Sequence, residues 1–150
     1  MEQDQLRTII LVEDKHPYKA TLTRQLKRRG FHVEMWGCGL NCKICNPKEP
    51  QEFSEAPDFI KRIAADPKFR IVAIVLDVNQ FDSEATAIKQ IMPKLRADTM
   101  LAKIPVIMYS KAHIESLEDE ALDAGAVQYY DRYNTRALQA AEIIDKNALP

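Results

Sequence analysis

Three short runs of consecutive apolar residues constrain the fold of this chain more than any other feature. Each run lacks the polar alternation of a half-exposed strand, and each stops abruptly at an acidic or hydroxyl-bearing residue. The runs are Thr8–Val12, Ile71–Leu76 and Ile104–Tyr109. Continuous apolar, mostly β-branched runs of this length are typical of strands buried on both faces, as in a parallel sheet. The sequence therefore predicts a parallel sheet with helices packed on both sides.

Segments with helical spacing separate the strands and complete an alternating order. Two weaker strands are expected at Phe31–Trp36 and Val127–Tyr130. The expected helices span about residues 18–29, 59–64, 85–95 and 117–124, with a last one after Asn134. We expect Gly30 to end the first helix, Pro93 to kink or shorten the third, and Asn134 to cap the last. Alternation of five strands with five helices implies right-handed crossovers and a doubly wound α/β fold.

Length and charge exclude several classes of protein. A chain of 150 residues suits one domain with a sizeable core, so we predict a single domain over residues 1–150. The net formal charge of -1 gives no reason to expect a nucleic-acid partner. Because no apolar run is long enough to span a bilayer, we expect no membrane partner. Only 4 glycines are present, which makes a flavin or nucleotide site the weakest functional hypothesis.

The residues that end the strands carry the most suggestive chemistry. They are Glu13, Asp14, Asp77 and Ser110, with Arg132 just past the fifth strand. In an open parallel sheet, ligands bind beyond the carboxyl ends of the strands, where such side chains come together. Clustered carboxylates can hold Mg²⁺, and one of them can attack phosphorus to form an acyl phosphate. A nearby hydroxyl and cation would then bind the phosphoryl oxygens.

In these motifs the sequence resembles the response-regulator receiver domains of two-component signalling, which are CheY-like proteins. The motifs are Ile10–Asp14, Val75–Asp77, Ile104–Ser110, and Gly125-Ala126 followed by Tyr129. The resemblance covers a core of about residues 8–146, apart from an unusual cysteine-containing insertion at about 37–57 after the second strand. It implies a five-stranded parallel sheet, (βα)5, with the flavodoxin-like strand order 2-1-3-4-5.

The resemblance also implies a role for each residue of the acidic edge. Asp77 would accept a phosphoryl group from a histidine kinase or phosphotransfer protein in the presence of Mg²⁺. The implied magnesium ligands are Glu13, Asp14, Asp77 and Asn79. The implied phosphate switch comprises Ser110, Lys111, Tyr129 and Arg132.

The same resemblance implies a cytoplasmic signalling protein in a phosphorelay rather than an enzyme, with Mg²⁺-dependent self-dephosphorylation as a side reaction. Such a protein would bind a downstream protein through the face formed by the fourth helix, the fifth strand and the fifth helix. A homodimer is compatible with this expectation. The chain would act either alone or as the receiver of a longer protein.

Several positions depart from the family's pattern. Arg132 stands where the family has a lysine, and Tyr133 stands where the family has a proline. Arginine keeps the positive charge, but its planar guanidinium differs in geometry from a point-like ammonium. Lys111, at a position where the family has a small residue, offers an ammonium group from another direction. These departures leave open a degenerate receiver that binds partners without being phosphorylated.

The family does not explain the three cysteines, which all lie in the insertion at Cys38, Cys42 and Cys45. Three thiolates and a histidine can bind Zn²⁺, for which His32 and His113 are the candidates, although neither has local ligand spacing. Three thiolates can also hold an iron–sulfur cluster, two of them can form a reversible disulfide, and all three can remain unliganded. The alternative function is therefore a metal, iron–sulfur or thiol redox sensor built on a degenerate receiver scaffold.

Overall fold

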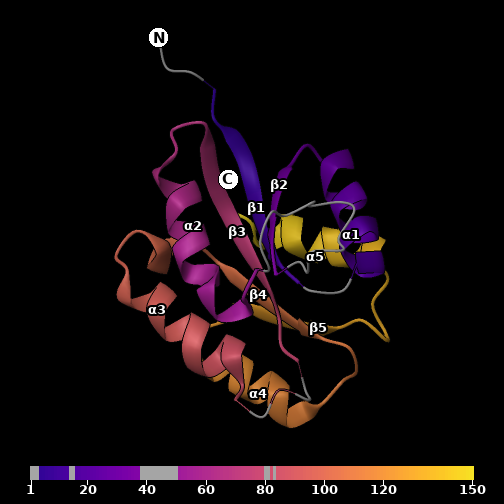
Figure 1. Ribbon diagram of the computed structural model, residues 1–150. Coiled ribbons are helices and arrows are strands. Elements are labelled where there is room, and N and C mark those ends of the chain that lie inside the picture. The colour runs from indigo at the N-terminus through magenta and orange to yellow at the C-terminus, as the bar shows by residue number, and fades with distance from the viewer. Residues whose placement is uncertain (1–3, 14–15, 38–50, 80–81, 83) are drawn as a thin grey trace.

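The computed structural model describes residues 4–13, 16–37, 51–79, 82 and 84–150. Within them, five parallel strands form one sheet in the order β2-β1-β3-β4-β5 (Figure 1). The strands are β1 (Leu6–Val12), β2 (His32–Trp36), β3 (Phe69–Asp77), β4 (Val106–Ser110) and β5 (Gln128–Asp131). This arrangement confirms the predicted doubly wound α/β fold and its strand order.

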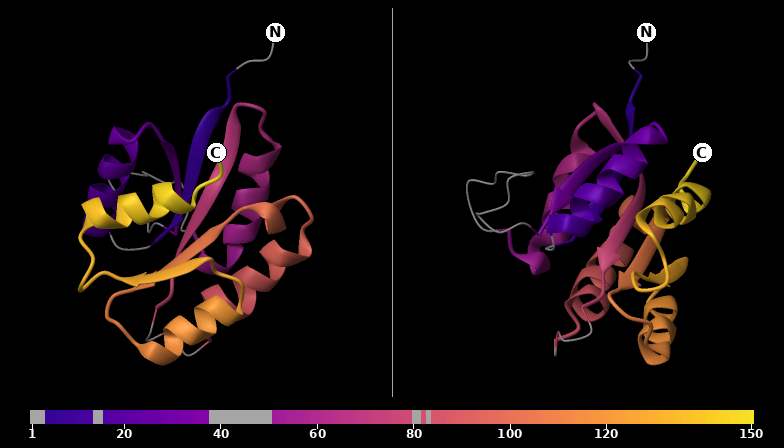
Figure 2. Two further views of the ribbon diagram at one scale, coloured as in Figure 1. Left: turned by 180° about the vertical axis from the view of Figure 1, so that it is seen from behind. Right: turned by 90° about the vertical axis from the view of Figure 1, so that its right-hand side faces the viewer.

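Helices cover both faces of the sheet. Among the described residues, the α-helices are α1 (His16–Arg28), α2 (Ala56–Ala65), α3 (Met92–Ala97), α4 (Glu115–Asp123) and α5 (Ala137–Asn147). Shorter turns are the 3-10 helices η1 (Phe53–Glu55) and η3 (Leu101–Lys103), and the π-helical η2 (Ala87–Ile91). Seen from behind, α5 crosses in front of the strands, whereas α2 and α3 flank them on the side that Figure 1 shows (Figure 2).

The sheet separates two hydrophobic cores because its central strands are apolar on both faces. One core packs α2, η2, α3 and α4 against the first face, with Ile60 and Met108 among its buried side chains. The other packs α1 and α5 against the second face, where Leu26 and Ile144 are buried. Residues 71–76 are all buried, which explains why this run shows no polar alternation.

Two glycines are required by the backbone near the ends of α1 and β2. Gly30 has a φ of +89°, and the amide of Phe31 donates to the carbonyl of Leu26 at 3.2 Å, so α1 ends in a Schellman turn as predicted. Gly37 has a φ of +107°, and a Cβ there would lie 3.2 Å from the carbonyl oxygen of Glu13. The end of β2 therefore packs closely against the end of β1.

The local predictions for the last and the third helix have different outcomes, and only the first of them is wrong. Asn134 does not cap α5, because the residue before that helix is Arg136, whose amide donates to Oε1 of Gln139 at 3.0 Å. The amide of Asn134 donates instead to Oδ1 of Asp131 at 2.7 Å. Pro93 lies within a continuous helical stretch, because Ile91 and Met92 before it already have helical backbone angles. The chain adjusts just before it, in the π-helical turn η2.

Candidate functional site

The ends of the strands bring four of the predicted residues to one edge of the sheet. Glu13 directly follows β1, Asp77 is the last residue of β3, and Ser110 is the last residue of β4. Asp77 lies in register with Tyr109 on the neighbouring strand. Arg132 follows β5, and its amide donates to the carbonyl of Ser110 at 2.9 Å. The carboxyl edge of the sheet therefore gathers two carboxylates, a hydroxyl and a guanidinium, as the sequence predicts.

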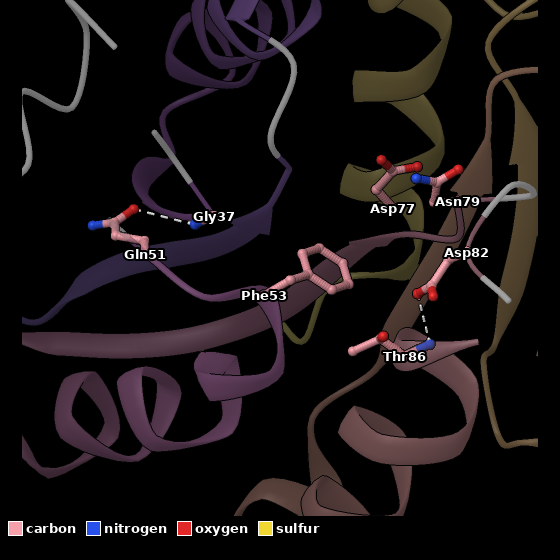
Figure 3. A pocket seen from close by; sticks show the side chains of 7 residues that line it. All are labelled: Gly37, Gln51, Phe53, Asp77, Asn79, Asp82 and Thr86. Carbon is pink, nitrogen blue, oxygen red and sulfur yellow. Dashed lines mark hydrogen bonds between the residues drawn. The ribbon is translucent and has the colours of Figure 1, made fainter. Parts of the chain in front are cut away.

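Asp77 opens onto a pocket of about 230 Å³. The other lining residues are Gly37, Gln51, Phe53, Asn79, Asp82 and Thr86. Figure 3 shows the side chains of Asp77 and Asn79 close together, with Phe53 lying between this pair and Gly37 in the view. Asp77 is 8% exposed, so it is largely buried without being sealed from solvent. The pocket leaves room for a small group beside the Asp77 carboxylate.

Asp82 is a second acid of this pocket, and the sequence analysis did not single it out. Its Oδ2 accepts a hydrogen bond from the amide of Thr86 at 2.9 Å (Figure 3), and its Oδ1 accepts one from the amide of Glu84 at 3.0 Å. These hydrogen bonds, above all the one from the Thr86 amide, lower the pKa of Asp82. The Asp82 carboxylate is thus engaged in shaping the turn that leads into η2.

Glu13 lies on the face of the sheet covered by α1 and α5. It is fully buried and accepts a hydrogen bond from the hydroxyl of Tyr109. Nη1 of Arg132 lies 4.0 Å from Oε2 of Glu13, and Cζ of the same arginine lies 4.3 Å from the centroid of the Tyr18 ring. A buried carboxylate needs such donors, because burying a charge without them is costly. Arg132 therefore helps to hold Glu13 and at the same time packs on α1.

The tyrosines around Glu13 form a cluster that the sequence analysis missed. The hydroxyl oxygens of Tyr18 and Tyr130 lie 2.5 Å apart, and the Tyr109 and Tyr130 rings stack with their centroids 5.2 Å apart. Burial raises the pKa of all three tyrosines, and the charge of Glu13 raises the pKa of Tyr109 further. Their hydroxyls therefore remain protonated donors. A signal was present in the sequence, since Tyr109 and Tyr130 each directly adjoin a predicted switch residue.

Ser110 and Tyr129 meet on the opposite face of the sheet, and both are buried. The Ser110 hydroxyl donates to the carbonyl of Ala112 at 2.5 Å, so it accepts the hydrogen bond that joins it to the Tyr129 hydroxyl. The His113 ring lies at the edge of the Tyr129 ring, with centroids 6.3 Å apart. Nδ1 of His113 is 3.8 Å from Oδ2 of Asp131. The predicted switch pair is thus in contact, beside the connection from β4 to α4.

The predicted metal or redox site lies mostly outside the described residues. This holds for Cys38, Cys42 and Cys45, and the predicted magnesium ligand Asp14 also lies outside them. His32, the first residue of β2, has its Nε2 2.7 Å from Oε1 of Glu34 and stacks on Phe69. In the described part of the chain, no three His, Cys, Asp or Glu side chains gather closely enough to hold a metal ion. No observation there supports the sensor alternative.

The residues on either side of the cysteine segment meet beside the Asp77 pocket. The amide of Gly37 donates to Oε1 of Gln51 at 3.1 Å, and Nε1 of Trp36 donates to the carbonyl of Glu52 at 2.7 Å. The last residues of the insertion expected at about 37–57 belong to η1 and to the start of α2. Both flanks of the segment are therefore tied together next to the phosphoacceptor candidate.

We compared the sequence and the structure with known proteins. No protein-family model and no curated protein matches the sequence. Among solved structures, chemotaxis protein CheY4 of Vibrio cholerae matches with a TM-score of 0.68 and 15% identity, covering 95% of this chain and 98% of that chain. A response regulator from Thermotoga maritima matches with a TM-score of 0.62 and 20% identity, covering 94% and 96% of the two chains. The chain has the fold of a response-regulator receiver domain.

The receiver fold also allows the predicted cation to be tested against the residues present. A further structural neighbour, the Mn²⁺-bound form of the response regulator Rcp1, has a TM-score of 0.59 and 17% identity, covering 93% of this chain and 92% of that chain. In this chain the described edge offers the carboxylates of Glu13 and Asp77 and the oxygen atoms of Asn79. These are oxygen donors, which suit a hard divalent cation that keeps several waters.

None of the described helices is long and apolar enough to cross a membrane.

Proposed function

We propose that this chain is a phosphoacceptor receiver that takes a phosphoryl group on Asp77 from a histidine kinase or phosphotransfer protein. The position of Asp77 carries the proposal, because this residue ends the central strand β3 and opens onto a pocket large enough for a small group. In the transfer, a carboxylate oxygen of Asp77 bonds to phosphorus while the bond from phosphorus to the donor's imidazole nitrogen breaks. The imidazole then regains a proton from solvent.

Charge on the phosphoryl oxygens must be balanced for this transfer. Glu13, Asp77 and Asn79, together with Asp14, would hold Mg²⁺, which supplies positive charge to the phosphoryl group when bound. The Ser110 hydroxyl ends the next strand and would donate a hydrogen bond to a phosphoryl oxygen. Lys111 follows it directly and is exposed, so it can supply the ammonium group that the family places after β5. Arg132 would contribute through the field of its guanidinium.

The proposed output is a change of protein contacts rather than catalysis on a separate substrate. When Ser110 turns toward the phosphoryl group, it gives up its hydrogen bond with Tyr129, and Tyr129 is then free to change rotamer. Apolar side chains are exposed along α4, β5 and α5, namely Leu122, Val127 and Leu138. We propose that a downstream protein, or a second copy of the chain, binds this face in the cytoplasm. Slow Mg²⁺-dependent hydrolysis of the acyl phosphate would reset the signal.

The proposal is tested by incubating the purified chain with acetyl phosphate and Mg²⁺ and measuring its intact mass. We expect one phosphoryl adduct that disappears in Asp77→Asn. Asp82→Asn is the matched control, because Asp82 lines the same pocket but its carboxylate is engaged by backbone amides. This control variant should keep the adduct. A wild-type chain that stays unmodified, or an adduct that persists in Asp77→Asn, would contradict the proposal.

A further inference from the structure

A second and larger cavity lies beside the acidic edge, and two of its lining residues, Lys111 and Arg132, also belong to the proposed phosphate switch. This groove has a volume of about 550 Å³ and lies between the first turn of α1 and the connection from β5 to α5. Residues that line it include Tyr18, Thr21, Lys111, Arg132, Thr135 and Arg136. None of the described residues that line the groove also lines the Asp77 pocket. The groove is therefore a separate candidate site, and its volume falls within the range of small-molecule sites.

The groove is positively charged although the chain as a whole is not. Among the described residues, three cations line it, Lys111 after β4, Arg132 after β5 and Arg136 before α5, and no described acidic residue does. In the whole sequence, 21 lysines and arginines are balanced by 22 acids. Within the described part of the chain, neither Lys111 nor Arg136 forms an ion pair. Two exposed cations without acidic partners therefore face the same concave surface as Arg132.

Arg132 is held in place at the inner wall of the groove. Its side chain is 21% exposed, its guanidinium covers the Tyr18 ring, and Glu13 lies behind it. A guanidinium fixed in this way loses little conformational freedom when it binds an anion, and its fork of donors matches phosphate oxygens. The site is thus partly formed before any ligand arrives.

Two helices also begin at this groove. Pro17 and Tyr18 of α1 line one side, and Arg136 and Ala137 at the start of α5 line the other. The amino end of a helix carries a partial positive charge and amides without intrahelical partners. Because α1 and α5 both present this end to the groove, the backbone adds to the positive field of the three side chains. The field and the volume together favour a ligand with more than one negative group.

We propose that this groove binds a small anion that carries at least two phosphoryl groups. The proposal goes beyond phosphotransfer to Asp77 and does not depend on it. Arg136 and Lys111 bind the outer oxygens, and Arg132 binds the inner ones. Tyr133, which is 85% exposed and also lines the groove, offers a ring on which a base can stack. The shared chemistry is a diphosphate, which can come from inorganic pyrophosphate or from a nucleoside diphosphate.

The test is isothermal titration of the purified full chain, without Mg²⁺, with pyrophosphate, ADP and inorganic phosphate. We expect saturable binding of pyrophosphate that weakens as the NaCl concentration rises, and binding of inorganic phosphate at least about tenfold weaker. Arg136→Ala should weaken pyrophosphate binding by about tenfold or more. Arg28→Ala is the matched control, because Arg28 is an exposed arginine at the other end of α1, and it should bind like the wild type.

Two further variants separate the ligand sources and the two sites. If a nucleotide is preferred, Tyr133→Ala should weaken the binding of ADP but not that of pyrophosphate. Asp77→Asn should retain pyrophosphate binding, and Arg136→Ala should still form the acyl-phosphate adduct, so this proposal and the proposed function fail independently. Equal binding by Arg136→Ala and Arg28→Ala, or loss of pyrophosphate binding in Asp77→Asn, would overturn the groove as the site.

Discussion

The two faces of the sheet use tyrosine hydroxyls in different ways at the same edge. On the face covered by α1 and α5, Tyr109 donates to the buried Glu13 carboxylate, beside the Arg132 guanidinium. On the other face, Tyr129 is hydrogen-bonded to the neutral Ser110 hydroxyl. Neighbouring residues of one strand point to opposite faces, so the pairs 109/110 and 129/130 each divide between these environments.

We call the face of Glu13 and Tyr109 the support face, and the face of Ser110 and Tyr129, where the proposed switch lies, the switch face. The support face contains the buried Glu13 carboxylate. Leaving this charge buried without its hydrogen-bond donors would be costly, so this face resists rearrangement. The Tyr129 face joins two neutral hydroxyls next to the connection from β4 to α4, where Ser110 already has a second partner in the Ala112 carbonyl. A rearrangement of Ser110 therefore costs less than one of Tyr109. This difference fits the proposed switch, in which Ser110 and Tyr129 move while Glu13 stays in place.

Alkaline pH should destabilise the folded protein through the tyrosines of the support face, and this is the largest effect that we expect. The folded-state pKa values of Tyr109 and Tyr130 lie well above the unfolded value, and burial is the main cause. The neutral hydroxyls thus contribute stability that is fully present below about pH 10 and is lost as pH rises above it, since the unfolded chain releases these protons first. We expect the urea midpoint, followed by Trp36 fluorescence, to fall steeply from pH 9 to pH 11.

Phenylalanine variants assign this alkaline loss to a face of the sheet. The double variant Tyr109→Phe/Tyr130→Phe should show a flatter decline above pH 10 than the wild type, because neither ring can ionise. Tyr129→Phe is the matched control on the opposite face, and its decline should remain closer to that of the wild type. An equal flattening in both variants would show that the two faces do not differ in this respect.

At neutral pH, the hydroxyl deletions should differ in the free energy of unfolding. Tyr109→Phe removes a hydrogen bond to a buried charge, so we expect a loss of about 2 kcal/mol. Tyr129→Phe removes a bond between neutral hydroxyls, so we expect a loss of about 1 kcal/mol or less. Urea denaturation of both variants in the same buffer measures the difference. The comparison fails if Tyr129→Phe proves the more damaging change.

The sequence predicted the switch face but not the support face, and the reason is physical. Apolar runs ending at Glu13, Asp77 and Ser110 give the strands and the edge at which they meet, because a parallel sheet aligns its carboxyl ends. The contact between Tyr109 and Glu13 depends on which face each strand residue meets, and on the registers of β1 and β3 relative to β4. A run such as Ile104–Tyr109 reads as a uniform buried strand, so its terminal hydroxyl is indistinguishable from apolar packing.

Returning Arg132 to the family's lysine tests whether the support face uses the guanidinium as such. Arg132→Lys keeps the charge near Glu13 but removes the planar group that lies over the Tyr18 ring. We expect a loss of about 0.5–1 kcal/mol in the free energy of unfolding, the range of such a stacked cation. Acyl-phosphate formation should persist, because Lys111 and the new lysine both supply an ammonium group. No change in stability would show that Arg132 acts on this face through its charge alone.

Acid pH should produce the smallest effect, and it concerns the Asp77 pocket rather than the tyrosines. Asp82 has a lowered pKa in the folded protein, chiefly because the Thr86 amide donates to it. Its contribution to stability is therefore present above the unfolded pKa near 4 and is lost as pH falls through the lower folded value. Since the carboxylate is largely solvated, we expect it to contribute only about 0.3–0.5 kcal/mol to the free energy of unfolding. In thermal unfolding, the Tm of Asp82→Asn should fall less between pH 6 and pH 3 than the Tm of the wild type. Asp119→Asn, which changes an exposed acid of α4, is the control and should follow the wild type. If this variant also showed a smaller fall in Tm, general charge rather than the Asp82 hydrogen bonds would explain the acid sensitivity.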